Sequence, residues 1–554
     1  MGEHTSVREP GRALALDALR GLAILMMCLS GLVPEGLPNW MYHGYYPRFL
    51  PDAEGVWHAV ADPYTHRWQW SSFTWVDWVF PMFLFAMGAA FPLALGRRLD
   101  RGASIRRLVL GVLGRGLSLI GFAIYVRQIV PSFIEQPVSP GTWCLGLVGF
   151  ALLFPVLTRL PSRWTQGAKC FTRLLGLVLL GGFVVYLNRG DGASFSYADN
   201  NIIILLLAHM ALAGSLIWLI TRHHPRVRLV FLLLAYLAHD KAMYVPGDPV
   251  RDTLLNGASW IDTLVTWPKQ VLDLRWLNDL LPVGLPDGVL NLSPLYDFTW
   301  YKFLFIVIPG TILGDLIRQR MKASDSSDHG SVQPAHGGRY GWMVFALVGL
   351  ILSVLVGLHC YGRTLATLGR FELVTPWVTW LGVVPFGLIV LWASGGAGKT
   401  SLGSVRVMVL WGLFWLVLGL VADPFEVGIT KGPPATLSYY FVSLGLSVLL
   451  LSLLTILIDE LGYVRTFGLL TANGQNPMLA YVGIRNLLAP LVMLPLLRPL
   501  AGHFQWITGE SLNAFVINLL PEVPWYQFIW AVVQTMMLAV IVAGFTRCRV
   551  IWRA

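Results

Sequence analysis

The sequence predicts an all-α protein, a polytopic transmembrane bundle of about 11–14 helices with both termini in the cytoplasm. Hydrophobic residues make up 55% of the 554 residues and charged residues only 13%, whereas soluble domains carry about 25% charged residues. The apolar residues come in blocks of about 18–22, the length that crosses ~30 Å of hydrocarbon. The 23 Trp and 18 Tyr residues gather at the block ends, as expected at a membrane surface.

The first apolar block, residues 14–33, is expected to be an uncleaved helix. Asp17 and Arg20 interrupt its start, and no small-residue cleavage site follows, so a signal peptide is disfavoured. The further expected spans are 73–95, 108–130, 141–159, 173–188, 201–220, 228–245, 298–317, 341–360, 374–394, 405–421, 438–458, 474–496 and 524–545. The weaker blocks 173–188 and 228–245 could be half-spans. No polar stretch is long enough to fold alone, so we expect residues 1–554 to form one membrane domain.

The basic residues set the predicted orientation. With the N-terminus inside, most loop Arg and Lys residues fall on the cytoplasmic side, including those of residues 97–107 and 318–339. The net charge of +10 then faces the anionic lipid of the inner leaflet, and no nucleic acid partner is needed to explain it. The two long outer loops, 34–72 and 246–297, are rich in aromatic residues and proline, which favours a lid or vestibule over a site in the membrane.

Metal and nucleotide motifs are not supported. The five Cys residues are scattered without a CxxC pair, and there is no H-x-x-H motif, so no metal is expected. Residues 394–400 resemble a phosphate-binding loop, but Ala393 replaces the required glycine and the segment follows a membrane helix. A tight turn is the better interpretation.

Asp77 is the most informative ionisable residue, because it lies where the second span begins. It could cap the helix, orient a histidine or act as a base. The preceding outer loop holds His43, His58 and His66. A single loop histidine is usually just solvated, but His66 stands a few residues before the second span. A His66–Asp77 pair could act as a general base or accept an acyl group. Asp240 follows His239 and forms a weaker second pair.

Other polar residues have two interpretations each. Asp17 and Arg20 share a helix face, where a structural ion pair is at least as plausible as a function. Asn473, Gln475 and Asn476 could donate hydrogen bonds to an acyl carbonyl, or could tie helices together, which is favoured. These three residues, together with Trp70 of the first outer loop, are the candidate substrate contacts.

Several segments resemble a known family in order along the chain. Residues 16–21 read LDALRG, and residues 73–92 read FTWVDWVFPMFLFAMGAAFP. Residues 305–310 (FIVIPG), 436–440 (TLSYY) and 474–481 (GQNPMLAY) follow. On these motifs the chain resembles bacterial multi-pass membrane proteins similar to heparan-α-glucosaminide N-acetyltransferase. The resemblance runs over nearly the whole chain, and the motif around Asp77 is its most specific part.

This resemblance implies an acetyl-CoA-dependent O- or N-acyltransferase in a bacterial inner membrane. Such an enzyme takes acetyl from cytoplasmic acetyl-CoA and delivers it to an extracytoplasmic amino sugar or glycan. The family's active-site histidine lies about ten residues before the motif aspartate, so its role passes to His66, although the longer first loop adds two competing histidines. The phosphates of acetyl-CoA would favour a basic loop that contains Arg97, Arg98, Arg101, Arg106 and Arg107.

Two rival functions remain at this stage. A carrier for a sugar or a lipid-linked envelope intermediate would also suit many spans and two aromatic outer loops. A scaffold for envelope assembly is the third. A histidine–carboxylate pair near a pocket open to CoA would favour the enzyme, whereas helices broken at mid-membrane would favour transport. The sequence leaves homodimerisation open.

Overall fold

The computed structural model describes most of the helical segments of the chain. The described residues are 13–44, 48–51, 57–60, 73–188, 197, 199–233, 235, 259–280, 290–326, 337–368, 377–395, 401–423, 429, 431, 435–493 and 523–552.

In these residues, ten helices are long and apolar enough to cross a membrane, which confirms the predicted polytopic all-α fold. They are Trp75–Asp100, Ile105–Gln128, Pro140–Leu157, Gln166–Leu187, Ile202–Thr221, Ser293–Lys322, Gly338–His359, Gly403–Ala422, Leu437–Glu460 and Pro524–Arg547. Thr379–Ala393 and Pro477–Met493 are shorter apolar helices, and α1 (Leu14–Ser30) has 17 residues. Every expected span therefore coincides with a helix except 228–245, which lies largely outside the described residues. The protein is an integral multi-pass membrane protein.

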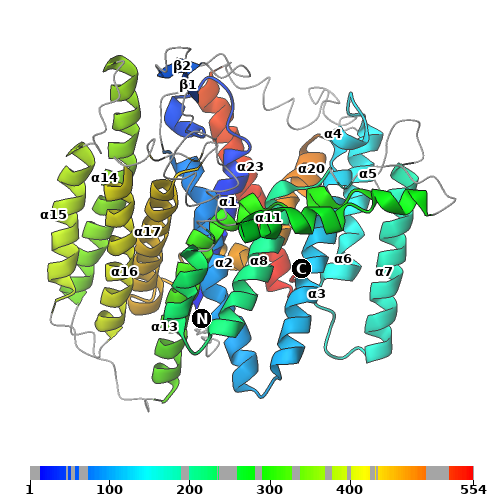
Figure 1. Cartoon of the computed structure of the whole chain (residues 1–554), viewed down its shortest axis with the longest axis horizontal. Coiled ribbons are helices and arrows are strands. Elements are labelled where there is room, and N and C mark those ends of the chain that lie inside the picture. Colours follow the sequence, from blue (N-terminus) through cyan, green and yellow to red (C-terminus); the bar gives the residue numbers. More distant parts are fainter. Residues whose placement is uncertain are drawn as a thin grey trace, which may run out of the picture. The chain divides into compact units, whose positions relative to one another are not determined.

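The helices group into two compact units, each built from segments far apart in the sequence. The first unit comprises Met1–Ser30, Pro38–Arg101 and Pro309–Gly474. Its elements are α1, η1 (Asn39–Met41), β1 (Arg48–Pro51), β2 (Trp57–Val60), α2 (Trp75–Asp100), most of α13 (Leu304–Ser326), α14 (Gly337–Leu368), α15 (Trp377–Ala393), α16 (Ser401–Ala422), α17 (Leu437–Leu454), the π-helical η7 (Thr455–Glu460) and α18 (Gly468–Gln475). Strands β1 and β2 pair antiparallel, and helices α14–α17 stand side by side (Figure 1).

The second unit comprises Gly31–Leu37, Gly102–Ile308 and Gln475–Ala554. Its helices are α3 (Ile105–Gln128), α4 (Pro131–Ile134), α5 (Pro140–Ala151), α6 (Leu153–Leu157), α7 (Gln166–Leu187), α8 (Ile202–Thr221), α11 (Ser259–Leu272), α19 (Pro477–Gly483), the π-helical η8 (Ile484–Leu488), α20 (Ala489–Met493) and α23 (Pro524–Arg547). Short 3₁₀ turns are η2 (Pro225–Val227), η3 (Arg275–Asp279), η4 (Ser293–Leu295) and η5 (Phe298–Phe303). Helices α3 and α8 pack on each other, as do α6 and α7.

The exposed surface of several helices is strongly apolar. On α7, for example, Phe171, Leu177 and Val178 are 67%, 54% and 63% exposed. Exposure of such side chains to water is unfavourable, whereas exposure to hydrocarbon is not. In hydrocarbon only the backbone polar groups need hydrogen-bond partners within the protein. The exposure of these apolar side chains thus agrees with the hydropathy of membrane-spanning helices.

In the first unit, helices α1 and α18 cross at very short range. A Cβ added to Gly474 would lie 1.7 Å from the carbonyl oxygen of Asp17, and one added to Gly21 would lie 1.9 Å from that of Leu470. Only glycine permits this backbone contact. The crossing therefore joins the first motif of the sequence to the last.

Arg20 ties the same crossing to α2. Its guanidinium lies 3.3 Å from a carboxylate oxygen of Asp17 and donates to the carbonyl oxygens of Gly474 and Ala86, at 3.3 and 3.4 Å. These contacts favour the structural interpretation of the Asp17–Arg20 pair, because the arginine holds three helices together.

Candidate functional site

Asp77 lies in the first turn of α2 with its side chain only 1% exposed. Thr74 is the N-cap, and its backbone N–H donates to Oδ2 of Asp77 at 3.1 Å. The N–H of Gly44 donates to the same oxygen at 2.9 Å. The hydroxyl of Thr74 holds the returning loop by donating to the carbonyl oxygen of Tyr42 at 2.7 Å. Two backbone donors thus keep a buried carboxylate in place at the helix start.

His43 completes the surroundings of this carboxylate. Its Nδ1 lies 2.8 Å from Oδ1 of Asp77, and its side chain is 44% exposed. A carboxylate can only accept here, so the proton of this hydrogen bond sits on Nδ1. In the neutral imidazole the lone pair is then on Nε2, the nitrogen that does not face Asp77. The aspartate orients an accessible histidine, which is the arrangement needed for a base or a nucleophile.

Lys431 is the third ionisable member of the site, after Asp77 and His43. Its Nζ lies 3.3 Å from Nδ1 of His43, and the residue is partly buried in the segment that leads into α17. Burial lowers the pKa of the Lys431 amine, an effect that attraction to Asp77 opposes. Lys431 is not among the site residues predicted from the sequence. A lysine at the expected outer end of a span, where basic residues are scarce, was the one signal for it.

Helix α17 holds the start of α2 in place through two hydrogen bonds. The hydroxyl of Tyr439 donates to the backbone carbonyl oxygen of Asp77 at 3.0 Å, and the indole N–H of Trp78 donates to Ser447 at 2.9 Å. All these groups are buried. The start of α2 is therefore fixed against α17, and the direction of the Asp77 carboxylate is fixed with it.

The structure shows the position of two of the three histidines of the first outer loop. Of the three loop histidines, it places His43 on Asp77. His66 and Trp70 lie outside the described residues, so the predicted His66–Asp77 pair stays a prediction. The backbone of His58 belongs to β2 and pairs with Leu50 of β1.

The polar residues around the last motif make local hydrogen bonds. Asn473 is fully buried, and its amide donates to the carbonyl oxygen of Leu469 at 2.9 Å. In the second unit, the amide of Asn476 donates to Val550 O at 2.8 Å and accepts from the N–H of Trp552 at 3.1 Å. The bonds of Asn476 tie the start of α19 to the segment that follows α23, whereas the Asn473 bond lies within α18. Gln475, between them, is half-buried.

The predicted phosphate-binding arginines are all exposed: Arg97, Arg98, Arg101, Arg106 and Arg107. They line the end of α2 and the start of α3. Asp100 of the same stretch accepts from Arg318 at 2.7 Å and lies 2.9 Å from Lys322. The end of α2 opposite Asp77 is thus strongly basic.

We expect the stability of the site to depend on alkaline pH through Lys431. Because burial lowers its pKa, the folded protein releases this proton at a lower pH than the unfolded chain does. Between the two pKa values the unfolded chain binds more protons, so stability rises with pH. The melting temperature of the wild type, relative to Lys431→Met, should therefore increase as the pH rises toward the ordinary lysine pKa of about 10.4. Lys169→Met, in the first turn of α7 and outside the site, is the control. A difference in melting temperature between wild type and Lys431→Met that does not change with pH would contradict the expectation.

Comparison with known families adds one finding. Residues 12–286 match the model of a domain of unknown function (DUF5009). This match contains His43 and Asp77, while Lys431 lies beyond it. No curated protein matches the chain by sequence.

Proposed function

We propose that this membrane protein is an acyltransferase of a bacterial inner membrane, which moves an acetyl group from cytoplasmic acetyl-CoA to an extracytoplasmic amino sugar or glycan. The observation that carries the proposal is the hydrogen bond between His43 and the buried Asp77. A histidine that is oriented by a carboxylate and keeps an accessible face is the basic unit of acyl-transfer sites. The resemblance of the second-span motif to acetyltransferases supports the same class.

The residues suffice for a balanced reaction. Nε2 of His43 attacks the thioester carbonyl, the C–S bond breaks, and CoA leaves as a thiolate, so that the ring becomes an acyl-imidazolium whose Nδ1–H still donates to Asp77. The acceptor amine then attacks the acyl carbon, and the C–N bond to histidine breaks. Nε2 takes the amine proton and releases it to water, which offsets the proton that the CoA thiolate takes up. Asp77 holds the ring throughout, and Lys431 lies close enough to offset the carboxylate charge. A direct attack, with His43 as general base, uses the same groups.

The length of α2 restricts where acetyl-CoA can bind. Asp77 and Arg97 are separated by about 20 residues of one helix, or roughly 30 Å at 1.5 Å per residue. Phosphates held at Arg97 and a thioester held at His43 would thus lie near opposite membrane surfaces. Under the proposal, the basic loop attracts the nucleotide from the cytoplasm, and the thioester arm must enter the protein to reach the histidine.

His43→Gln is expected to lower acetyl-CoA turnover with glucosamine about 10²–10⁴-fold, because it removes the group that accepts the proton or the acetyl. The measurement is acceptor-dependent CoA release by the purified protein, beside His66→Gln as the matched histidine variant. Loss of turnover in His66→Gln alone would transfer the catalytic role to His66. Wild-type turnover in both variants would contradict the proposal that a histidine of this loop carries out acetyl transfer.

One observation favours the carrier as a second candidate. The helical segment of residues 468–493 is broken, since α18 ends at Gln475 and α19 begins at Pro477. Broken helices often line transport sites in carriers. Uptake of glucosamine into proteoliposomes, without CoA release in the presence of any acceptor, would establish this function instead.

A further inference from the structure

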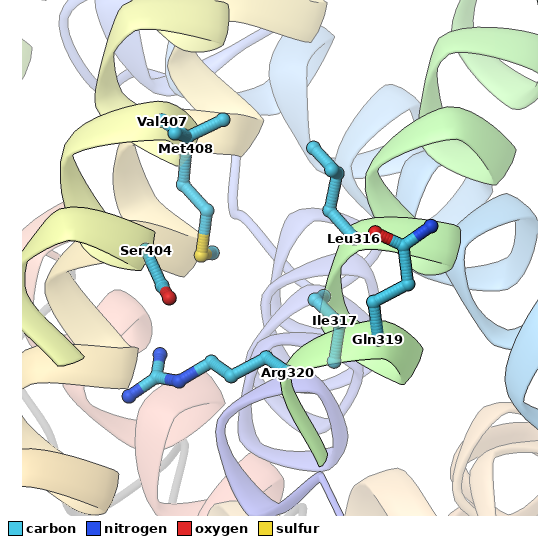
Figure 2. Close-up of a pocket in the computed structure, with 7 residues that line it drawn as sticks. All are labelled: Leu316, Ile317, Gln319, Arg320, Ser404, Val407 and Met408. Carbon is cyan, nitrogen blue, oxygen red and sulfur yellow. The ribbon is translucent and has the colours of Figure 1, made fainter. Parts of the chain in front are cut away.

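A cavity lies between α13 and α16 in the first unit, far along the chain from Asp77. It has a volume of about 290 Å³. Its lining residues are Leu316, Ile317, Gln319, Arg320, Ser404, Val407 and Met408. Figure 2 shows Arg320 reaching across from its own helix toward Ser404, with Val407 and Met408 further along α16. The cavity therefore combines an apolar wall with one polar end. Because Val407 is 47% exposed, the wall is open to the surroundings of the protein.

The polar end holds an arginine that is paired with a glutamate and has further N–H donors. Arg320 donates from one terminal nitrogen to Oε1 of Glu460, and Tyr340 donates to Oε2 of Glu460 at 3.1 Å. A guanidinium has five N–H donors in a planar fork. In the described part of the chain, Glu460 is the acceptor that Arg320 meets, so the fork can also bind an oxyanion. Arginine is well suited to phosphate groups for this reason.

The neighbouring charges are also mostly basic. Arg318 and Lys322, on the same helix end, share the carboxylate of Asp100. Three basic residues of α13 thus face the two acidic partners Asp100 and Glu460, and Asp315 precedes them on the same helix. The predicted orientation places this end of α13 at the cytoplasmic leaflet, where anionic lipids are found.

We infer that the cavity is a binding site for an anionic phospholipid of the cytoplasmic leaflet. The phosphodiester lies at Arg320 and Ser404, and the first part of an acyl chain lies along Leu316, Val407 and Met408. A volume of about 290 Å³ is near the lower limit of ligand sites. It therefore suits a lipid that is only partly enclosed, its remaining chain lying in the bilayer. The inference does not depend on the proposed acyl transfer.

Native mass spectrometry of the full-length protein, titrated with phosphatidylglycerol, tests this site. Arg320→Gln should weaken retention of the lipid roughly five-fold, as expected for one basic contact at the membrane surface. Arg320→Gln also removes the partner of Glu460, so Val407→Trp provides a second variant that fills the cavity and keeps the ion pair. Arg339→Gln, an exposed arginine on α14, is the matched control and should bind as the wild type does.

Each outcome decides the proposal. Weaker binding in both cavity variants, with phosphatidylcholine unable to compete, supports an anionic lipid site. Equal binding of phosphatidylcholine, or wild-type retention of phosphatidylglycerol by Arg320→Gln and Val407→Trp, overturns it. Binding of inorganic phosphate at the same affinity as the lipid would also overturn it, because the apolar wall would then contribute nothing.

Discussion

Asp77→Asn should reduce acetyl transfer about 10³–10⁴-fold, on the scale seen when the orienting aspartate of a catalytic triad is made neutral. The asparagine oxygen can still accept from the backbone N–H groups of Gly44 and Thr74. Its NH₂ group, however, would donate to Nδ1 of His43. That exchange moves the ring proton to Nε2, where it blocks both attack on a thioester and removal of a proton.

The readout is CoA release that depends on an acceptor, together with the melting temperature of the purified protein. Asp279→Asn, at an exposed 3₁₀ turn of the second unit, is the control carboxylate. Wild-type turnover in Asp77→Asn would limit Asp77 to capping α2. If Asp77→Asn does not fold, its lost turnover says nothing about chemistry, and His43→Gln then decides whether the histidine takes part in transfer.

Gly474→Ala is expected to destabilise the first unit by about 3 kcal/mol or more, because a methyl group is forced into well-packed backbone. The new Cβ would lie 1.7 Å from the carbonyl oxygen of Asp17, and no rotation of a side chain can relieve a clash with backbone. Helices α1 and α18 would have to separate. The hydrogen bond from Arg20 to the Gly474 carbonyl oxygen, at 3.3 Å, would be lost with that movement.

Yield and melting temperature in detergent measure this effect. Gly181→Ala in α7 is the matched control, because a Cβ there meets nothing within 4 Å. The control should be neutral or stabilising by up to about 1 kcal/mol, since alanine favours helix more than glycine does. Equal melting temperatures for Gly474→Ala and the wild type would show that the crossing can open without cost.

The fold was predictable wherever hydropathy alone decides it, and the differences lie at helix ends. The expected span 73–95 stops where the apolar residues stop, but α2 runs from Trp75 to Asp100. Charged residues such as Arg97 end the apolar block, but they can continue the helix beyond the membrane because they are hydrated there. The block 173–188 looked short for the same reason, because α7 begins at Gln166 with polar residues. The grouping into two units depends on contacts between distant segments, which hydropathy does not encode.

For the candidate site, Asp77 could be predicted from the sequence, but the residues that contact it could not. Asp77 was identifiable because a carboxylate in an apolar block needs a reason, and two of its proposed roles, capping and orienting a histidine, occur together. Spacing along the chain could not favour His43 over His66, because His43 lies 34 residues before Asp77 and reaches it only through the fold of the loop. Lys431 lies 388 residues beyond His43, so its unusual place at the outer end of a span could mark it as a candidate but could not pair it with His43.

These separations have a consequence for biosynthesis. Tyr439 reaches the backbone of Asp77 from 362 residues further along the chain, and Ser447 reaches Trp78 from 369. At about 5–20 residues per second, a ribosome needs roughly 20–70 s to make that stretch. During this interval the newly inserted α2 has neither its tyrosine nor its lysine neighbour, and the carboxylate depends on Thr74, Gly44 and His43 alone. Thr74, Gly44 and His43 are thus the described partners of this carboxylate that the ribosome makes first.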